Sequence, residues 1–170
     1  RLLPFEGEIM SSKVKKPEIA VWKGRKNEIL SFCINNSLSG FATSVENYVN
    51  AAYYNNYNCI VADDGTIING GLEGVKLLVM PYCYGLSKDL AKSVSDFVKG
   101  GGTVLCEAHL GGYDVDKGRH SEIMPGQDLW KEWGIREEET TAAYYLEQDT
   151  SETLRSDNTA PDLEGLSDDV

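Results

Sequence analysis

The stretch from Val75 to His109 reads VKLLVMPYCYGLSKDLAKSVSDFVKGGGTVLCEAH, and it decides the fold class. The apolar run Leu77–Met80 has the character of a buried strand. Apolar residues then recur at helical spacing from Ser87 to Val98, with Ser87 as the expected N-cap. Three glycines separate this helix from a second apolar run, Thr103–Cys106. Strand, helix, glycine turn and strand predict one crossover unit of a parallel sheet.

Two further strands are expected before this unit, at Glu18–Trp22 after Pro17 and at Asn58–Ala62. Between them, Lys23–Asn27 has the composition of a polar loop, and residues 28–39 fit neither helix nor strand clearly. Apolar residues spaced three and four apart predict a helix from Ser44 to about Asn55, with Ser44 as its N-cap.

Beyond the central unit we expect a short helix at Gln127–Trp133, a further strand starting near Ile135 and another at Thr140–Leu146. The whole pattern predicts an α/β protein, a three-layer sandwich around a mostly parallel, flavodoxin-like sheet of strand order 2-1-3-4. Because such sheets place ligands at the carboxyl ends of their strands, chemistry is expected near Tyr82–Gly85 and Glu107–Gly112.

Length and charge set the domain division. The 170 residues suit one domain, which we divide into a connecting arm (1–16), the α/β domain (17–146) and an acidic tail or linker (147–170). The tail holds eight acidic residues and one basic residue, Arg155, so it carries −7 of the formal charge of −11. This charge repels phosphate backbones and argues against nucleic-acid binding. No apolar run is long enough to span a bilayer, and the start at Arg1 suggests a piece of a longer protein.

The four cysteines, Cys33, Cys59, Cys83 and Cys106, show no zinc-ligand spacing. Two of them fall inside expected strands, where cysteine acts as a small core residue. We therefore expect free thiols, which slightly favour a cytoplasmic over a secreted protein.

Three segments resemble the class I glutamine amidotransferase-like domain of carbohydrate-active enzymes, above all the trimerisation domain of family 42 β-galactosidases. They are LEGVKLLVMPYCYGLSKDLAKSVSDFVKGGGTVLCE (72–107), IAVWKGRKNE (19–28) and DLWKEWGIREEE (128–139). The resemblance implies a class I glutamine amidotransferase-like fold and a non-catalytic accessory domain of a larger glycoside hydrolase. It also implies a homo-oligomer that packs against the catalytic barrel of the parent chain, with residues 1–16 as the connection.

The resemblance also raises an alternative, a stand-alone enzyme of the amidotransferase superfamily. Cys83 and His109 follow two neighbouring strands, and a thiolate beside an imidazole is a nucleophile. Amidotransferases carry their cysteine as G-x-C-x-G on a tight turn. Here Tyr82 and Tyr84 flank Cys83 and only the second glycine, Gly85, is present. The bulky flanks favour a packed loop cysteine, so we assign no catalytic residue.

Acidic and histidine side chains crowd one segment: Glu107, His109, Asp114, Asp116, His120 and Glu122. Their spacing matches no known metal loop, and we expect no metal and no cofactor. A carboxylate pair of Glu107 with Asp63 or Asp64 for glycoside hydrolysis is a weaker alternative. Because strand ends hold them rigidly, Tyr82, Glu107 and His109 are our candidate ligand-binding residues.

Aromatic residues are numerous, and three explanations stay open for them: core packing, a protein interface, or stacking on sugars. Trp22 is expected in the core. Carbohydrate is thus a further candidate partner, and a carbohydrate-binding module is a further candidate function. Nucleotide binding is disfavoured, since neither GxGxxG nor GxxxxGK[ST] occurs.

Overall fold

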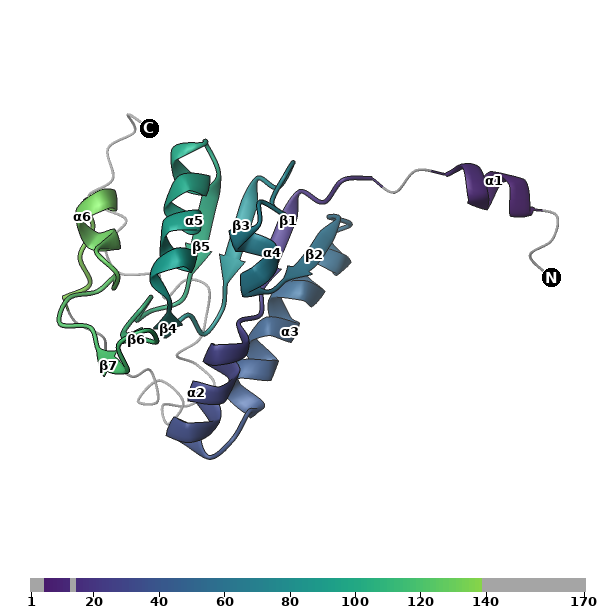
Figure 1. Ribbon diagram of the computed structural model, residues 1–170. Helices are drawn as coiled ribbons and strands as arrows, with labels where there is room; N and C mark the ends of the chain where they lie inside the picture. Colours follow the sequence, from purple (N-terminus) through teal and green to yellow (C-terminus); the bar gives the residue numbers. More distant parts are fainter. Residues whose placement is uncertain (1–4, 13–14, 139–170) are drawn as a thin grey trace, which may run out of the picture. The chain divides into compact units, whose positions relative to one another are not determined.

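The structure is a computed structural model that describes residues 5–12 and 15–138. Its centre is a four-stranded parallel sheet of order β2-β1-β3-β5, formed by β1 (Ile19–Trp22), β2 (Cys59–Ala62), β3 (Leu77–Met80) and β5 (Thr103–Cys106) (Figure 1). Register pairs Ile19 with both Cys59 and Leu77, and Leu77 with Thr103. The predicted α/β class and the strand order 2-1-3-4 are confirmed.

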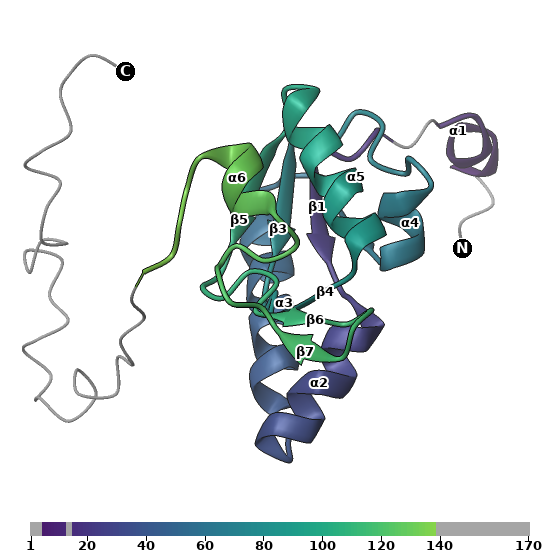
Figure 2. The same cartoon turned by 60° about the vertical axis from the view of Figure 1, so that its left-hand side comes forward.

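Helices cover both faces of this sheet. One face, which carries Trp22, Leu78 and Met80, packs against α4 (Asp64–Ile68) and α5 (Lys88–Lys99). The opposite face, with Val21 and Val79, packs against α3 (Ser39–Tyr54). The two views show α3 on the other side of the sheet from α4 and α5 (Figures 1 and 2). The three-layer arrangement follows from the alternation of side chains along each strand.

The remaining elements lie mostly near the carboxyl ends of the strands. They are α2 (Arg25–Asn35), the short strands β4 (Gly85–Leu86), β6 (Tyr113–Asp114) and β7 (Arg119–His120), and α6 (Leu129–Trp133). The short strands form a second sheet of order β4-β6-β7, in which β6 and β7 are antiparallel. A further helix, α1 (Glu6–Ser11), lies within the predicted connecting arm.

Helix α5 confirms the prediction from its periodicity. The Ser87 hydroxyl accepts a hydrogen bond from the Leu90 amide (3.4 Å), which satisfies one of the free N–H groups of the first turn. Leu90, Ala91 and Val94 are buried on one side of the helix, while Lys88, Lys92 and Lys99 are spread around its other sides.

Three expectations along the chain were wrong. Lys23–Asn27 is not a loop throughout, because α2 already begins at Arg25. Helix α3 begins at Ser39, five residues before the expected N-cap Ser44, whose hydroxyl hydrogen-bonds to Glu107 instead. Helix α4 lies where only a turn was expected; the Asp63 side chain caps it by accepting from the Thr66 amide (2.7 Å).

Smaller differences concern the end of the described part. The predicted short helix is confirmed over Leu129–Trp133. Where a strand was expected to begin near Ile135, there is only an isolated antiparallel bridge between Met124 and Glu137. The strand expected at 140–146 and the acidic tail at 147–170 lie outside the described residues.

Trp22 is a core residue, as predicted. Within the described residues, no helix has both the length and the apolar character that a membrane span requires.

Candidate site at the carboxyl ends of β3 and β5

A hollow of about 370 Å³ lies at the carboxyl ends of β3 and β5. The three candidate ligand-binding residues all line it, so the structure brings Tyr82, Glu107 and His109 together. Its other lining residues are Ile34, Asn35, Tyr84 and Ala108. The wall of the hollow is mostly apolar and is formed largely by aromatic rings and aliphatic carbon atoms. A catalytic site would need polar groups that are free to act on a substrate.

Tyr82 joins β3 to the helices beside it. Its φ of 49° lies in the left-handed region, which is uncommon for a bulky residue and requires support from its surroundings. That support comes from three directions. Asn27 donates a side-chain hydrogen bond to the Tyr82 carbonyl, Asn35 donates one to the Tyr82 hydroxyl, and the ring packs edge-on against Phe41 at 6.1 Å. Tyr82 thus connects α2 and α3 to the tip of the sheet.

Glu107 holds this turn from the neighbouring strand. One carboxylate oxygen accepts the Tyr82 backbone N–H (2.9 Å), and the other accepts the Ser44 hydroxyl. Burial, followed by the nearby Glu107 charge, raises the pKa of Tyr48. Because both carboxylate oxygens are already bound within the protein, Glu107 acts here as a positioning residue for Tyr82.

Cys83 is fully buried, and its thiol donates a hydrogen bond to the Glu107 backbone carbonyl (3.1 Å). Contact with the Cys106 thiol, together with burial, raises the pKa of Cys83 and so disfavours the nucleophilic thiolate. An exposed elbow, as the stand-alone enzyme alternative requires, is not the arrangement found here.

His109 interacts with Glu137 and Tyr84. Its backbone N–H donates to the Glu137 carboxylate (2.9 Å), and its Nδ1 lies 3.6 Å from that carboxylate. Its ring meets Tyr84 edge-on at 6.3 Å. The Cys83 thiol and the His109 imidazole therefore have different partners: the thiol binds the Glu107 carbonyl, and the imidazole lies against Glu137 and Tyr84.

Two of the other acidic residues singled out from the sequence, Asp114 and Asp116, hold the local backbone. Asp114 accepts the backbone N–H groups of Asp116 and Lys117, both at 3.0 Å. Burial works to raise the pKa of Asp114, but these amides and the side chains of Lys117 and Gln127 outweigh it and hold the pKa at about 2. Asp116 in turn accepts the Lys88 amide at the start of α5.

Neither a metal centre nor a catalytic carboxylate pair is assembled from the predicted residues. Asp63 caps α4 and Asp64 accepts the Trp22 indole N–H (2.7 Å), while Glu107 is bound to Ser44 and Tyr82. In residues 5–12 and 15–138, no group of three or more His, Cys, Asp or Glu side chains is placed to hold a metal ion.

Two residues that complete this site were missed by sequence reasoning. Asn27 is buried and bridges Tyr82 to Gly85, whose N–H donates to its side-chain oxygen (2.7 Å). Ser44 supplies the hydroxyl to Glu107. A buried asparagine in the first turn of a helix leaves little trace in sequence, since its partners are 55 and 58 residues away.

Comparison with known proteins gives one family match. The family model described as the β-galactosidase trimerisation domain matches residues 39–170. This match confirms the resemblance that the sequence motifs predict.

Eight chains of solved structures match as well. One is a β-galactosidase from Bifidobacterium adolescentis, with 18% identity, a TM-score of 0.61, and coverage of 75% of this chain and 59% of that chain. Another is the polyextremophilic β-galactosidase from the Antarctic haloarchaeon Halorubrum lacusprofundi, with 17% identity, a TM-score of 0.55, and coverage of 69% of this chain and 17% of that chain. At these identities the likeness concerns the fold, and the match spans only part of either protein. A search of the curated proteins finds no match.

Proposed function

The chain belongs to the β-galactosidase trimerisation domain family, and on that premise we propose that it serves a larger glycoside hydrolase as its oligomerisation domain. The family match over residues 39–170 is the observation that carries this function. The polar groups at the strand tips are already bound to one another. An oligomerisation domain acts instead through its exposed surfaces, which contact the neighbouring subunits.

Catalysis by the parent enzyme is placed elsewhere in this proposal. An eight-stranded barrel takes roughly 250 residues, more than the 170 of this sequence, so we place the catalytic barrel in another part of the parent chain. We propose that residues 1–16 connect the domain to that barrel and that residues 147–170 serve as an acidic tail or linker. The parent enzyme's reaction, by this proposal, is the hydrolysis of a β-galactoside.

The oligomeric state of the 170-residue chain tests the proposal. We expect its mass by sedimentation velocity and light scattering to rise with concentration from 18.7 kDa towards three times that value. A chain that stays monomeric up to the highest attainable concentration contradicts an oligomerisation role.

A second candidate function concerns the hollow, and the rings of Tyr82, Tyr84 and His109 on its wall favour it. Aromatic faces stack on the apolar faces of sugars, so carbohydrate is the ligand class to test. Titration with galactose and lactose, followed by NMR of the tyrosine and histidine ring protons, should move the Tyr84 and His109 signals if sugar binds. Unmoved ring signals at saturating sugar would remove this second function. Tyr113, which also stacks near Tyr84, is the internal control.

A further inference from the structure

Residues 29–62 form a surface almost without charge. This span covers most of α2, all of α3 and β2, and contains a single charged residue, Glu46, whereas a quarter of the whole chain is charged. Many of its side chains are nevertheless exposed to solvent. Charged residues are depleted, and aromatic residues enriched, at the centres of protein interfaces. We call this region the α2–α3 surface.

Helix α2 turns most of its apolar side chains outward, with Leu30 as the partly buried exception beside Gly85. Its buried residues are polar, Asn27 and Ser31. Ile29 and Phe32 are half exposed, at 53% and 52%, and Leu38 lies beside them just beyond the helix. A small apolar hollow of about 190 Å³ lies among Ile29, Phe32, Leu38, Arg25 and Glu28. We call Ile29, Phe32 and Leu38 the α2 patch; it has the character of a pocket that receives one side chain of a partner.

A second apolar patch lies at the other end of α3. Tyr53 and Tyr54 in the last turn, Tyr57 after it and Val61 in β2 are all exposed. The rings of Tyr53 and Tyr54 meet edge-on at 5.7 Å. Tyrosine suits an interface because it offers a large contact area at a low cost in side-chain entropy. We call Tyr53, Tyr54, Tyr57 and Val61 the α3–β2 patch.

We infer that these two patches bind each other between copies of this chain: the α2 patch of one copy receives the α3–β2 patch of the next. The inference rests on the proposed oligomerisation function. A closed ring of three copies needs two different complementary surfaces on each copy, because a self-complementary surface gives a two-fold pair. The patches are two separate surfaces, since Leu38 directly precedes the 16-residue helix α3, which spans roughly 24 Å, and Tyr53 and Tyr54 end it.

The character of the two patches also makes them complementary. The α2 patch is a hollow with aliphatic and aromatic walls, and the α3–β2 patch presents projecting tyrosine rings. A large aromatic anchor in an apolar pocket is the usual centre of a protein interface. Because both patches lack net charge, their association is expected to be insensitive to salt.

Variants of single patches test this pairing. Phe32→Ser removes the centre of the α2 patch and Tyr54→Ser removes a ring of the α3–β2 patch; both residues are at least half exposed, so neither change should unfold the monomer. Ile135→Ser is the matched control, since Ile135 is 52% exposed but lies outside the α2–α3 surface. We expect each patch variant to raise the dissociation constant of the assembly at least tenfold, and the control to leave it unchanged.

Mixing the two patch variants is the decisive step. Phe32→Ser retains an intact α3–β2 patch and Tyr54→Ser an intact α2 patch, so an equal mixture should form a two-chain complex that neither variant forms alone. A mixture that stays monomeric contradicts the pairing.

Cys33 provides a second readout. It is exposed in α2 beside Phe32, whereas Cys83 is buried. Alkylation of Cys33 by iodoacetamide should slow as the concentration of the wild-type chain rises, and should stay fast in both patch variants. If the wild-type chain assembles and both variants assemble equally well, the inferred pairing is wrong while the oligomerisation function stands. If the wild-type chain never assembles, both are wrong.

Discussion

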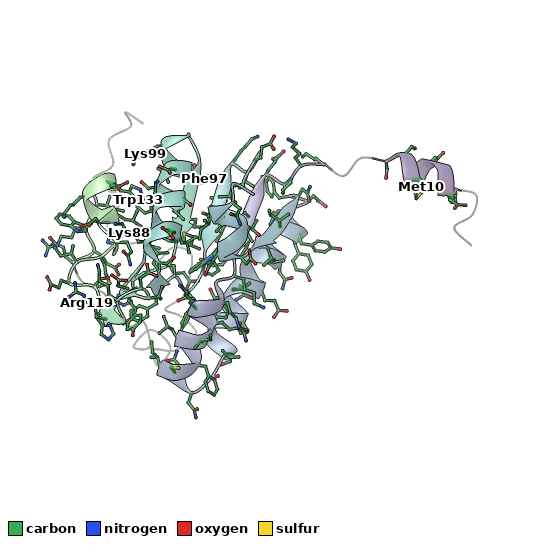
Figure 3. All side chains as sticks on the ribbon, viewed as in Figure 1. Met10, Lys88, Phe97, Lys99, Arg119 and Trp133 are labelled. Carbon is green, nitrogen blue, oxygen red and sulfur yellow. The ribbon has the colours of Figure 1, made fainter. Side chains whose placement is uncertain are left out.

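Helices α5 and α2 are of similar length and bury opposite kinds of side chain. Helix α5 buries Leu90, Ala91 and Val94 and carries its lysines on the remaining sides. Helix α2 buries Asn27 and Ser31 and exposes Ile29 and Phe32. Figure 3 shows Lys88 and Lys99 towards opposite ends of α5, and Trp133 on the neighbouring α6. The difference indicates that the outer side of α5 is suited to contact with water. The exposed side of α2 has instead the apolar character of a protein-binding surface.

The largest effect should come from the buried side of α5. Leu90→Ala removes a side chain that is 1% exposed and leaves a cavity, so we expect a loss of about 3 kcal/mol in the free energy of unfolding. Leu38→Ala, in the α2 patch, is the matched control and should cost far less in the monomer. Urea unfolding at a concentration where the chain is monomeric measures both. Equal losses would contradict the contrast between the two helices.

Asn27→Ala should have the next largest effect. It removes the side chain that binds the Tyr82 carbonyl and the Gly85 N–H, leaving two backbone groups without these partners in a buried place. We expect a loss of about 2 kcal/mol in the free energy of unfolding. Asn47→Ala, on the exposed side of α3, is the control and should be nearly neutral. If Asn27→Ala is also neutral, the polar side of α2 does not fix its orientation.

Asp114→Asn should change how the stability of the domain depends on pH. The pKa of Asp114 is held at about 2, below its usual 3.8, so the ionised form stabilises the folded state above pH 4, and this stabilisation is lost as pH falls towards 2. We expect the variant to be less stable by about 1 kcal/mol at pH 7 and to approach the wild type near pH 2. Thermal unfolding across this range measures the gap. Asp96→Asn, on the exposed side of α5, should show no such convergence.

Lys99→Ala should have the smallest effect. The Lys99 ammonium lies 2.9 Å from the Glu132 carboxylate, but both side chains are well exposed to solvent, where an ion pair contributes little. We expect thermal unfolding to match that of Lys92→Ala, a control in the same helix. A clear loss of stability confined to Lys99→Ala would mean that the position of α6 depends on this charge. It would also contradict the view that the exposed lysines of α5 only face water.

The fold could be predicted because the strands and α5 have recognisable apolar patterns in the sequence. Leu77–Met80 and Thr103–Cys106 are apolar runs, and α5 has one apolar side and a serine cap. Helix α2 could not be predicted for the opposite reason: its fully buried residues are polar and most of its apolar residues are exposed, so its sequence has no buried apolar stripe.

The candidate site could be placed at the strand tips but not understood from sequence. Parallel strands bring Tyr82 and Glu107 to one edge of the sheet, as the topology predicts. The left-handed backbone of Tyr82 and His109 has no glycine to signal it. The hydroxyl of Ser44 was assigned to a helix cap, while its partner Glu107 lies 63 residues away.

The bond between Ser44 and Glu107 ties the surface helix α3 to the residue that follows β5. Ser44 belongs to α3, and the same carboxylate fixes the amide of Tyr82 on the wall of the hollow. A shift of α3 as neighbouring subunits dock would therefore pull on Glu107 and reshape the cavity it borders. Subunit assembly and cavity shape would then change together, so that a ligand in the hollow would affect the contact between subunits.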